Sequence, residues 1–282
     1  MSAHPYFHKR IALTTKHDKL RLIKPAFDEY VGCELFEVNL DTDKLGTFSG
    51  EIERVAPPRE TAIQKARIGM KKKGLSLGTA SEGSVGPDPI VPFIHSNTEH
   101  LVLVDDEIGI VISETYRSFE ITATTITAAP GQDLTSFLEK ADFPNHALIV
   151  RPNTQISSNC IKGINNHEQL ITAIEKSSKY SHNGFVVIES DLRAMHSPSR
   201  QRNIEEVAKL LAKRVSHLCP NCQIPGWGRV GYEKGLNCSE CELKNPDAIR
   251  QEKLGCVKCG HIELGKVISS TLNPAQCNFC NP

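Results

Sequence analysis

The cysteines of this 282-residue chain constrain its fold more than any other feature. Eight of the ten lie after residue 218, where they form four Cys-x-x-Cys pairs. Each tight Cys-x-x-Cys turn offers two thiolates, and two such turns complete the tetrahedral sulfur shell of a structural Zn²⁺. We therefore predict two structural zinc ions. Their predicted ligands are Cys219, Cys222, Cys238, Cys241, Cys256, Cys259, Cys277 and Cys280.

The spacing of the four pairs leaves open which pairs share a metal. The first and second pairs are separated by 15 residues and the third and fourth by 17, which favours sequential pairing. A nested arrangement with the outer pairs together is the alternative, because only 14 residues separate the second pair from the third. A redox or disulfide cluster is disfavoured, because the N-terminus lacks the apolar core of a secretory signal and thiols in a reducing compartment more often bind metal.

The charge balance argues against nucleic acid and membranes as partners. Lys plus Arg and Asp plus Glu both number 33, and the sequence pI is about 7.1. The cysteine-rich tail is acidic once eight thiolates on two zinc ions add about four negative charges, whereas phosphate binding requires the reverse. The apolar stretches are of strand length, far short of the roughly 20 residues of a membrane helix. We expect a cytoplasmic protein whose tail is structural or contacts a protein partner.

The composition changes near residue 216. Residues 216–282 contain few aliphatic side chains, so we predict a double zinc-ribbon domain there that needs metal to fold. In residues 8–215, strand-like and helix-like segments alternate, which predicts an α/β domain with a mixed central sheet, flanking helices and a cleft. Its best-marked helix begins with Ser197 as the predicted N-cap and Pro198 at the first helical position.

Polar segments at two predicted strand ends are candidates for chemistry. Thr14, Thr15 and Lys19 lie between the first strand and the first helix, where hydroxyls, an ammonium group and helix amides can hold a phosphate. A plain capped turn is the alternative there. Glu82 lies in a glycine-rich turn over residues 80–87, which can aim a carboxylate at a divalent ion and lets a ligand approach the backbone.

Three further groups are less specific. Glu189 and Asp191 share one face of a predicted strand, where they either share a metal or are solvated. Arg193 and Arg200 flank residues 197–199, and Arg200 adds positive charge to a helix N-terminus that already favours anions. Either an anionic ligand or a salt bridge to Asp191 accounts for the placement of Arg200. Glu60 and Lys65 lie on one predicted helix, as they would on any exposed helix surface.

Several strings spread over nearly the whole chain resemble a bacterial family that carries a domain of unknown function with C-terminal Cys-x-x-Cys knuckles. This resemblance implies no activity. The strings are Leu-Gly-Thr-Phe at 45–48, Ala-Ser-Glu-Gly-Ser at 80–84, His-Ala-Leu-Ile-Val-Arg-Pro at 146–152, Asp-Leu-Arg-Ala at 191–194, Pro-Gly-Trp-Gly-Arg at 225–229 and the closing Cys-Asn-Phe-Cys-Asn-Pro.

The order of polar segments in residues 10–215 is also similar to the inosine/xanthosine triphosphate pyrophosphatase superfamily. The superfamily's Thr/Ser-rich turn with a lysine is similar to residues 14–19, and its Glu-Asn-Ala-x-x-Lys-Ala helix is similar to residues 60–66. Its acidic turn is similar to residues 81–83, and its Ser-His-Arg helix start is similar to residues 197–200. The resemblance implies that superfamily's fold and magnesium-dependent hydrolysis of noncanonical nucleoside triphosphates. This chain departs from it in having one acid, Glu82, in the central motif, no histidine at 198 or 199, and a zinc module.

We therefore expect a magnesium-dependent pyrophosphohydrolase that acts on a nucleoside triphosphate or related diphosphate compound. Glu60 and Glu82 are expected to hold the cation, with Glu189 or Asp191 as general base or second metal ligand. The alternative is a noncatalytic zinc-ribbon protein that binds a protein or nucleic-acid partner. The side chains expected to contact phosphate are Thr14, Thr15, Lys19, Lys65, Arg193 and Arg200.

Overall fold

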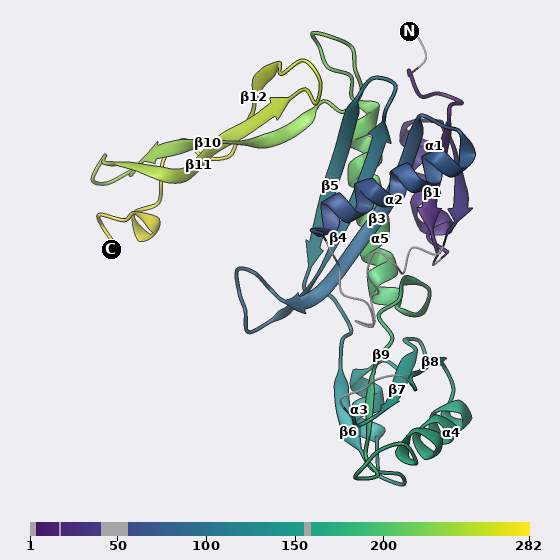
Figure 1. Cartoon of the computed structure of the whole chain (residues 1–282). Helices are drawn as coiled ribbons and strands as arrows, with labels where there is room; N and C mark the ends of the chain where they lie inside the picture. Colours follow the sequence, from purple (N-terminus) through teal and green to yellow (C-terminus); the bar gives the residue numbers. More distant parts are fainter. Residues whose placement is uncertain (1–3, 17, 41–55, 155–158) are drawn as a thin grey trace.

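The computed structural model describes residues 4–16, 18–40, 56–154 and 159–282. Figure 1 shows a sheet with helices on both faces, a smaller second sheet beyond one of its ends, and a long C-terminal arm. The mixed α/β architecture confirms the coarse prediction of fold class. The string at residues 45–48 lies outside the described residues.

The first sheet has five strands in the order β2-β1-β3-β4-β5. β1 pairs in parallel with β2 and β3, whereas β3, β4 and β5 form an antiparallel meander. The hairpin strands β3 and β4 extend well past the end of β1. The strands are β1 (Arg10–Thr15), β2 (Glu34–Asn39), β3 (Leu77–Pro87), β4 (His95–Asp105) and β5 (Ile110–Ser118).

Three helices cover the two faces of this sheet. On one face α1 (Leu20–Tyr30) and α5 (Pro198–Ser216) pack on strand residues such as Leu13 and Leu103. On the other face α2 (Pro58–Lys73) packs through small residues, including Ala62, onto Ala80 and its neighbours. Alternate residues of each strand therefore belong to different cores, which decides the direction of every polar side chain discussed below.

A second, antiparallel sheet lies between β5 and α5 in the chain, where the sequence predicted only a single central sheet. Its strand order is β6-β9-β7-β8, and it has an apolar core of its own. Hydrophobic periodicity identifies strands one at a time and does not tell which strands pair, which explains the difference. The elements are β6 (Thr125–Ala128), α3 (Thr135–Lys140), β7 (Leu148–Pro152), β8 (Ile161–Ile164), α4 (His167–Ser178) and β9 (Val186–Ser190).

The N-terminus of α5 is capped by a histidine that precedes strand β7 of the second sheet. Pro198 takes the predicted first helical position, but the Ser197 side chain makes no capping hydrogen bond. Instead, His146 Nε2 accepts from the Ser199 amide at 3.1 Å, while His146 Nδ1 lies 2.8 Å from Asp142 Oδ2. A long-range contact that sequence spacing does not reveal therefore caps this helix.

The C-terminal arm is a three-stranded antiparallel sheet that extends away from the other two (Figure 1). It consists of β10 (Gly228–Asn237), β11 (Lys244–Gly255) and β12 (Ile262–Val267), with β11 in the middle. Short 3-10 turns occur at Ala194–His196 and Pro274–Gln276. Across the described ranges, none of the helices has both the length and the apolar character to span a membrane.

Candidate functional site

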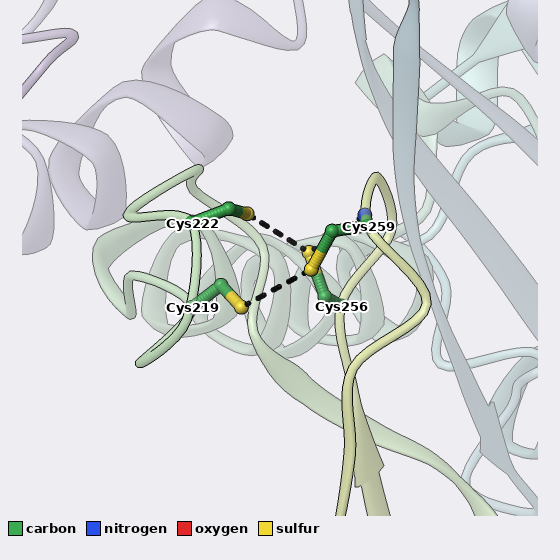
Figure 2. A group of neighbouring side chains, drawn as sticks. All are labelled: Cys219, Cys222, Cys256 and Cys259. Carbon is green, nitrogen blue, oxygen red and sulfur yellow. Dashed lines mark hydrogen bonds between the residues drawn. The ribbon is translucent and has the colours of Figure 1, made fainter.

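The eight cysteines of the arm form two groups of four, and their pairing crosses the sequence order. In the proximal cluster Cys219 and Cys222 meet Cys256 and Cys259, with the four side chains drawn in Figure 2. The distal cluster joins the other two pairs. Within each cluster the sulfur atoms lie within 4.8 Å of one another. Sequential pairing, which the spacing favoured, and the nested alternative are both wrong. The distal ligands are Cys238, Cys241, Cys277 and Cys280.

Strand pairing explains this crossed arrangement. β10 and β11 form an antiparallel hairpin that places Gly228 opposite Gly255, so the first and third turns meet at its base. The second turn connects β10 to β11 at the other end of the hairpin. There a bridge between Cys238 and Leu272 brings the last turn alongside it. The pairing of β10 with β11 therefore determines which Cys-x-x-Cys turns share a cluster. The lengths of the segments between the turns do not determine it.

The sulfur spacing in both clusters fits a tetrahedral zinc ion. The Sγ atoms of Cys219 and Cys259 lie 3.8 Å apart and those of Cys222 and Cys256 lie 3.6 Å apart. The matching distal distances are 3.8 and 3.7 Å. Four sulfurs at the usual Zn–S distance of about 2.3 Å are separated by about 3.8 Å, whereas a disulfide requires about 2.05 Å. The two clusters therefore have the ligand sets of two structural zinc sites.

In each cluster the surroundings lower the pKa of one cysteine, Cys259 or Cys277, and raise the pKa of another, Cys222 or Cys280. The amides of Lys258 and Phe279 donate to Cys256 Sγ and Cys277 Sγ at 3.3 and 3.4 Å. Burial works to raise the pKa of Cys277, but the hydrogen bonds from the Phe279 amide and the Asn245 side chain outweigh it and lower the pKa to about 6. A thiol already poised to ionise loses its proton to zinc at little cost.

A second group of polar side chains is buried where β3 passes the end of β1. We call Lys19, Lys65, Glu82, Glu99 and Arg200 the charged cluster; each is less than a tenth exposed. The Lys65 ammonium pairs with the Glu82 carboxylate on the α2 face of the sheet. On the opposite face, Arg200 Nε donates to Glu99 Oε1 at 2.8 Å. The cluster therefore surrounds β3 from both sides.

Lys19 is the most unusual member of this cluster. Its ammonium group donates to Ser81 Oγ at 2.9 Å, a neutral partner for a buried cation. Burial, and secondly the charge of Arg200, lower the pKa of Lys19 to about 8 against the opposing effect of Glu99 and Glu82. Lys19 also caps the N-terminus of α1, whose first turn contains no acidic residue. Helix amides and a poorly neutralised ammonium together attract an anion.

Sequence reasoning missed Glu99, which is fully buried on β4. Asn97 donates to Glu99 Oε1 at 3.0 Å, and Asn203 of α5 donates to Asn97 at 2.7 Å. The one available signal was the pair Asn97 and Glu99 at alternate positions of a strand that continues as an apolar run. Gly83 leaves room for this network, because a Cβ atom there would lie 2.3 Å from Arg200 Nη2 and 2.6 Å from the Glu99 carboxylate oxygens.

Residues 65–282 match a family described as a domain of unknown function, DUF6671. The chain belongs to the DUF6671 family. No curated protein matches it significantly. The DUF6671 region contains both cysteine clusters and four members of the charged cluster, whereas Lys19 lies before it.

The structure brings together some of the predicted site residues of this DUF6671 chain and separates others. Lys19, Lys65, Glu82 and Arg200 converge in the charged cluster. Glu60 does not: it lies on the exposed face of α2, where it pairs with Arg59 at 3.4 Å. The helix phase is set by Ala62 and Ala66, which pack on the sheet and turn Glu60 outward. Magnesium binding by Glu60 together with Glu82 is therefore not supported by this arrangement.

The two predicted threonines at the end of β1 are both buried, but their side chains lie on opposite faces of the sheet. Thr14 faces α2, where Gly69 approaches it so closely that a Cβ atom would lie 1.9 Å from Thr14 Oγ1. That oxygen has no hydrogen-bond partner among the described residues. Thr15 is the last residue of β1 and points to the opposite face, the face of Lys19 and Ser81.

Glu189 and Asp191 have separate arginine partners, although they lie close together in the chain. Glu189 lies 3.4 Å from Arg151, and Asp191 accepts from Arg193 at 2.5 Å and from the Gly163 amide at 3.0 Å. The salt bridge to Asp191 that the sequence left open for Arg200 is not formed, because Arg193 pairs with Asp191 and Arg200 pairs with Glu99.

Both carboxylates line a cleft of about 510 Å³ between the two sheets. The cleft adjoins the charged cluster in two ways. β3 continues from Ser81 and Glu82 into the cleft wall, and the Arg200 guanidinium donates to the carbonyl of Leu192, which lines the cleft. A molecule in the cleft could therefore place a charged end against the cluster. The lining residues are Val85, Gly86, Pro87, His95, Ala123, Thr124, Thr125, Ile149, Glu189, Ser190, Asp191, Leu192 and Arg193.

Proposed function

We propose that this chain binds the phosphate groups of a nucleotide or related diphosphate compound at the charged cluster and hydrolyses a phosphoanhydride bond with magnesium. The observation that carries the proposal is the Lys19 ammonium, which is buried beside Arg200 with a neutral hydroxyl as its hydrogen-bond partner. A buried charge is costly unless it is paired, and a bound phosphate would supply the missing negative charge.

Two further observations support this function. Glu99 Oε2 is buried and has no hydrogen-bond partner within the described part of the chain, so it is left to contact a magnesium ion or to accept from a water bound to that ion. The adjoining cleft of about 510 Å³ falls within the usual range of roughly 300–1,000 Å³ for small-molecule sites. The similarity of the polar segments to the inosine/xanthosine triphosphate pyrophosphatase superfamily favours the same class of reaction.

The donor set suits magnesium held partly by its substrate. Among the described residues, no carboxylates or imidazoles form a group of three that could hold a metal. Mg²⁺ is commonly bound through one or two carboxylates together with substrate phosphates, a role that Glu82 can take. When bound, the ion would neutralise phosphate charge and lower the pKa of an attacking water.

The residues of the chain then have distinct tasks. Lys19 and Arg200 contact phosphate oxygens and stabilise negative charge on the bridging oxygen as its bond to phosphorus breaks. Lys65 holds the Glu82 carboxylate in place. The water oxygen forms the new bond to phosphorus and releases its proton to solvent. Glu60 is left out of this mechanism because it lies on the exposed face of α2. Glu189, Asp191 and Arg193 are left out because they line the cleft outside the charged cluster.

The test is phosphate and pyrophosphate release by the full-length, zinc-loaded protein from a panel of nucleotides with magnesium. Glu82→Gln and Lys19→Met are each expected to reduce turnover about a hundredfold. Glu29→Gln, a matched change on the exposed face of α1, should have no effect. No release across the panel, or full activity in both cluster variants, would rule out the proposed function.

A further inference from the structure

The two cysteine clusters contain copies of the same turn, which allows their surroundings to be compared position by position. In the first turn the Cys219 amide donates to the Ile224 carbonyl at 2.9 Å, and in the second the Cys238 amide donates to the Leu243 carbonyl at 3.0 Å. The residue before that carbonyl has a φ of 59° in both turns. Ile224 and Leu243 therefore occupy equivalent positions.

The proximal cluster uses this position to dock on the five-stranded sheet. Ile224 and Val257, which lies between Cys256 and Cys259, pack against the core that contains α1 and α5. Lys258 Nζ donates to the carbonyl of Ile108 in the turn between β4 and β5 at 2.6 Å. A zinc-knuckle pair in this protein thus binds an aliphatic surface through one side chain from each knuckle.

The distal cluster presents a similar apolar pair to solvent, with Leu243 at the position of Ile224 and Phe279 at the position of Lys258, one residue after that of Val257. Leu243 is 50% exposed, and Phe279, which lies between Cys277 and Cys280, is 56% exposed. Leu243 lies in the turn between β10 and β11, and Phe279 is close in sequence to the C-terminus, which Figure 1 marks at the far end of the arm. Paired, exposed apolar side chains on a rigid support are typical of an interaction site.

The charges around Leu243 and Phe279 indicate which class of molecule can bind to them. Glu240 and Glu242 are exposed on the second turn, and a zinc ion with four thiolates adds a net charge of about −2. The neighbouring Lys244 extends over Gly235, where a Cβ atom would lie 2.7 Å from its Cε. Nucleic acid and anionic lipid are repelled by such a surface, whereas a basic protein segment is attracted.

We propose that the distal surface, made of Leu243, Phe279, Glu240 and Glu242, docks a protein segment that presents aliphatic side chains flanked by lysine or arginine. The β4–β5 turn of a second copy of this chain is not available as that segment, because the second copy's own proximal cluster covers it. That turn also carries Asp105, Asp106 and Glu107, which an acidic surface repels. This proposal is independent of the phosphate chemistry.

The experiment uses two synthetic β-hairpin peptides with identical valine and isoleucine strands, one flanked by lysines and the other by glutamates. Fluorescence anisotropy with full-length, zinc-loaded protein should show saturable binding of the lysine hairpin that weakens with added salt. The glutamate hairpin should bind at least about tenfold more weakly.

Variants then locate the site. Leu243→Ser and Phe279→Ser should each weaken binding of the lysine hairpin by about tenfold or more. Ile262→Ser removes another exposed aliphatic side chain of the arm, 58% exposed, and should leave binding unchanged. Metal analysis checks that each variant keeps two zinc ions per chain.

Four results would overturn the proposal. The first two are equal affinity for the two hairpins and undiminished binding by both distal variants. The third is no binding of the lysine hairpin at millimolar concentration. The fourth is that a DNA duplex or phosphatidylserine vesicles bind more tightly than the lysine hairpin does.

Discussion

At the scale of single residues, the charged cluster joins residues that sequence reasoning could find with one that it could not. Lys19, Glu82 and Arg200 were found because a strand end or a helix start can bring amides and charged groups to one ligand, whereas Lys65 was found only through the resemblance of residues 60–66 to a superfamily motif. Glu60 was misplaced because a residue pair on a helix does not reveal which face is buried. Glu99 escaped notice because a carboxylate inside a strand is interpretable only when its arginine partner is known.

Lys19 gives a pH dependence with a definite sign. Its folded-state pKa is about 8, below the ordinary value of 10.5, so the folded chain binds fewer protons than the unfolded chain between these two pH values. Stability from this group therefore rises as the pH increases from about 8 to 10.5 and is lost as the pH falls through 8. Urea unfolding at pH 7 and 9.5 should show a larger gain for the ligand-free wild type than for Lys19→Met.

Phosphate binding should change in the opposite direction with pH. The ammonium charge that attracts an anion is present below pH 8, so affinity for the substrate phosphate should fall as the pH rises through that value. Isothermal titration with a nonhydrolysable nucleotide between pH 7 and 9 measures this affinity. An affinity that does not change over this range in the wild type would contradict Lys19 as the phosphate ligand.

Gly83 and Gly86 offer a matched pair of substitutions. A methyl group at Gly83 would collide with the Arg200 guanidinium and the Glu99 carboxylate, so Gly83→Ala should destabilise the fold by about 1–3 kcal/mol. A Cβ atom added at Gly86 would meet open space, so Gly86→Ala should change stability little. Urea denaturation distinguishes the two; equal stabilities would show that the buried pair is displaced without cost.

At the scale of elements, the arm shows why the metal ligands were predictable and their partnership was not. Four Cys-x-x-Cys turns identify eight ligands from spacing alone. The partnership depends on β10 and β11, whose pairing brings residues Gly228 and Gly255 together. These strands are irregular, with register shifts at three places, so they lack the clear alternation that would have marked a hairpin in the sequence.

The crossed pairing can be tested by protecting thiols. In a Cys219→Ser, Cys222→Ser double variant the proximal zinc should be lost, because two thiolates do not complete its shell. Cys256 and Cys259 should then react with iodoacetamide, while all four distal cysteines stay protected. Peptide mass spectrometry measures the labelling. Exposure of Cys238 and Cys241 would restore the sequential pairing that the spacing favoured.

An apolar side chain from a knuckle of each cluster should differ in its effect on folding. Val257 packs on the core of the five-stranded sheet, so Val257→Ser should destabilise the protein by about 1–2 kcal/mol through lost burial. Phe279→Ser removes an exposed side chain and should leave the melting temperature unchanged. A similar loss in both variants would show that the distal side chain is already packed in the free protein.

At the scale of the whole molecule, the three parts differ in what holds them together. Both sheets of the α/β part have continuous apolar cores, whereas the distal half of the arm has a small cluster around Leu236 and Leu272. The change of composition near residue 216 was visible in the sequence, but the second sheet was not, because its strands resemble those of the first. That the tail requires metal to fold stays a prediction.

Chelation tests this difference. Removing both zinc ions should expose the amides of the arm to hydrogen exchange, because the distal cluster has little else to stabilise it. The central strands β1, β3 and β4 should keep their protection, since the buried residues of their cores all come from the α/β part and the arm adds only partly buried side chains such as Ile224 and Val257. Exchange of the whole chain on chelation would instead show one cooperative unit.

The crossed order of the knuckles also affects how the chain is made. During synthesis from the N-terminus, Cys219, Cys222, Cys238 and Cys241 leave the ribosome before either correct partner exists, and these four thiols can already capture a zinc ion. Maturation then requires that early capture to be undone. We expect refolding in excess zinc to be slower than refolding in a chelator followed by addition of metal, and the rate to be limited by exchange of ligands between mismatched turns.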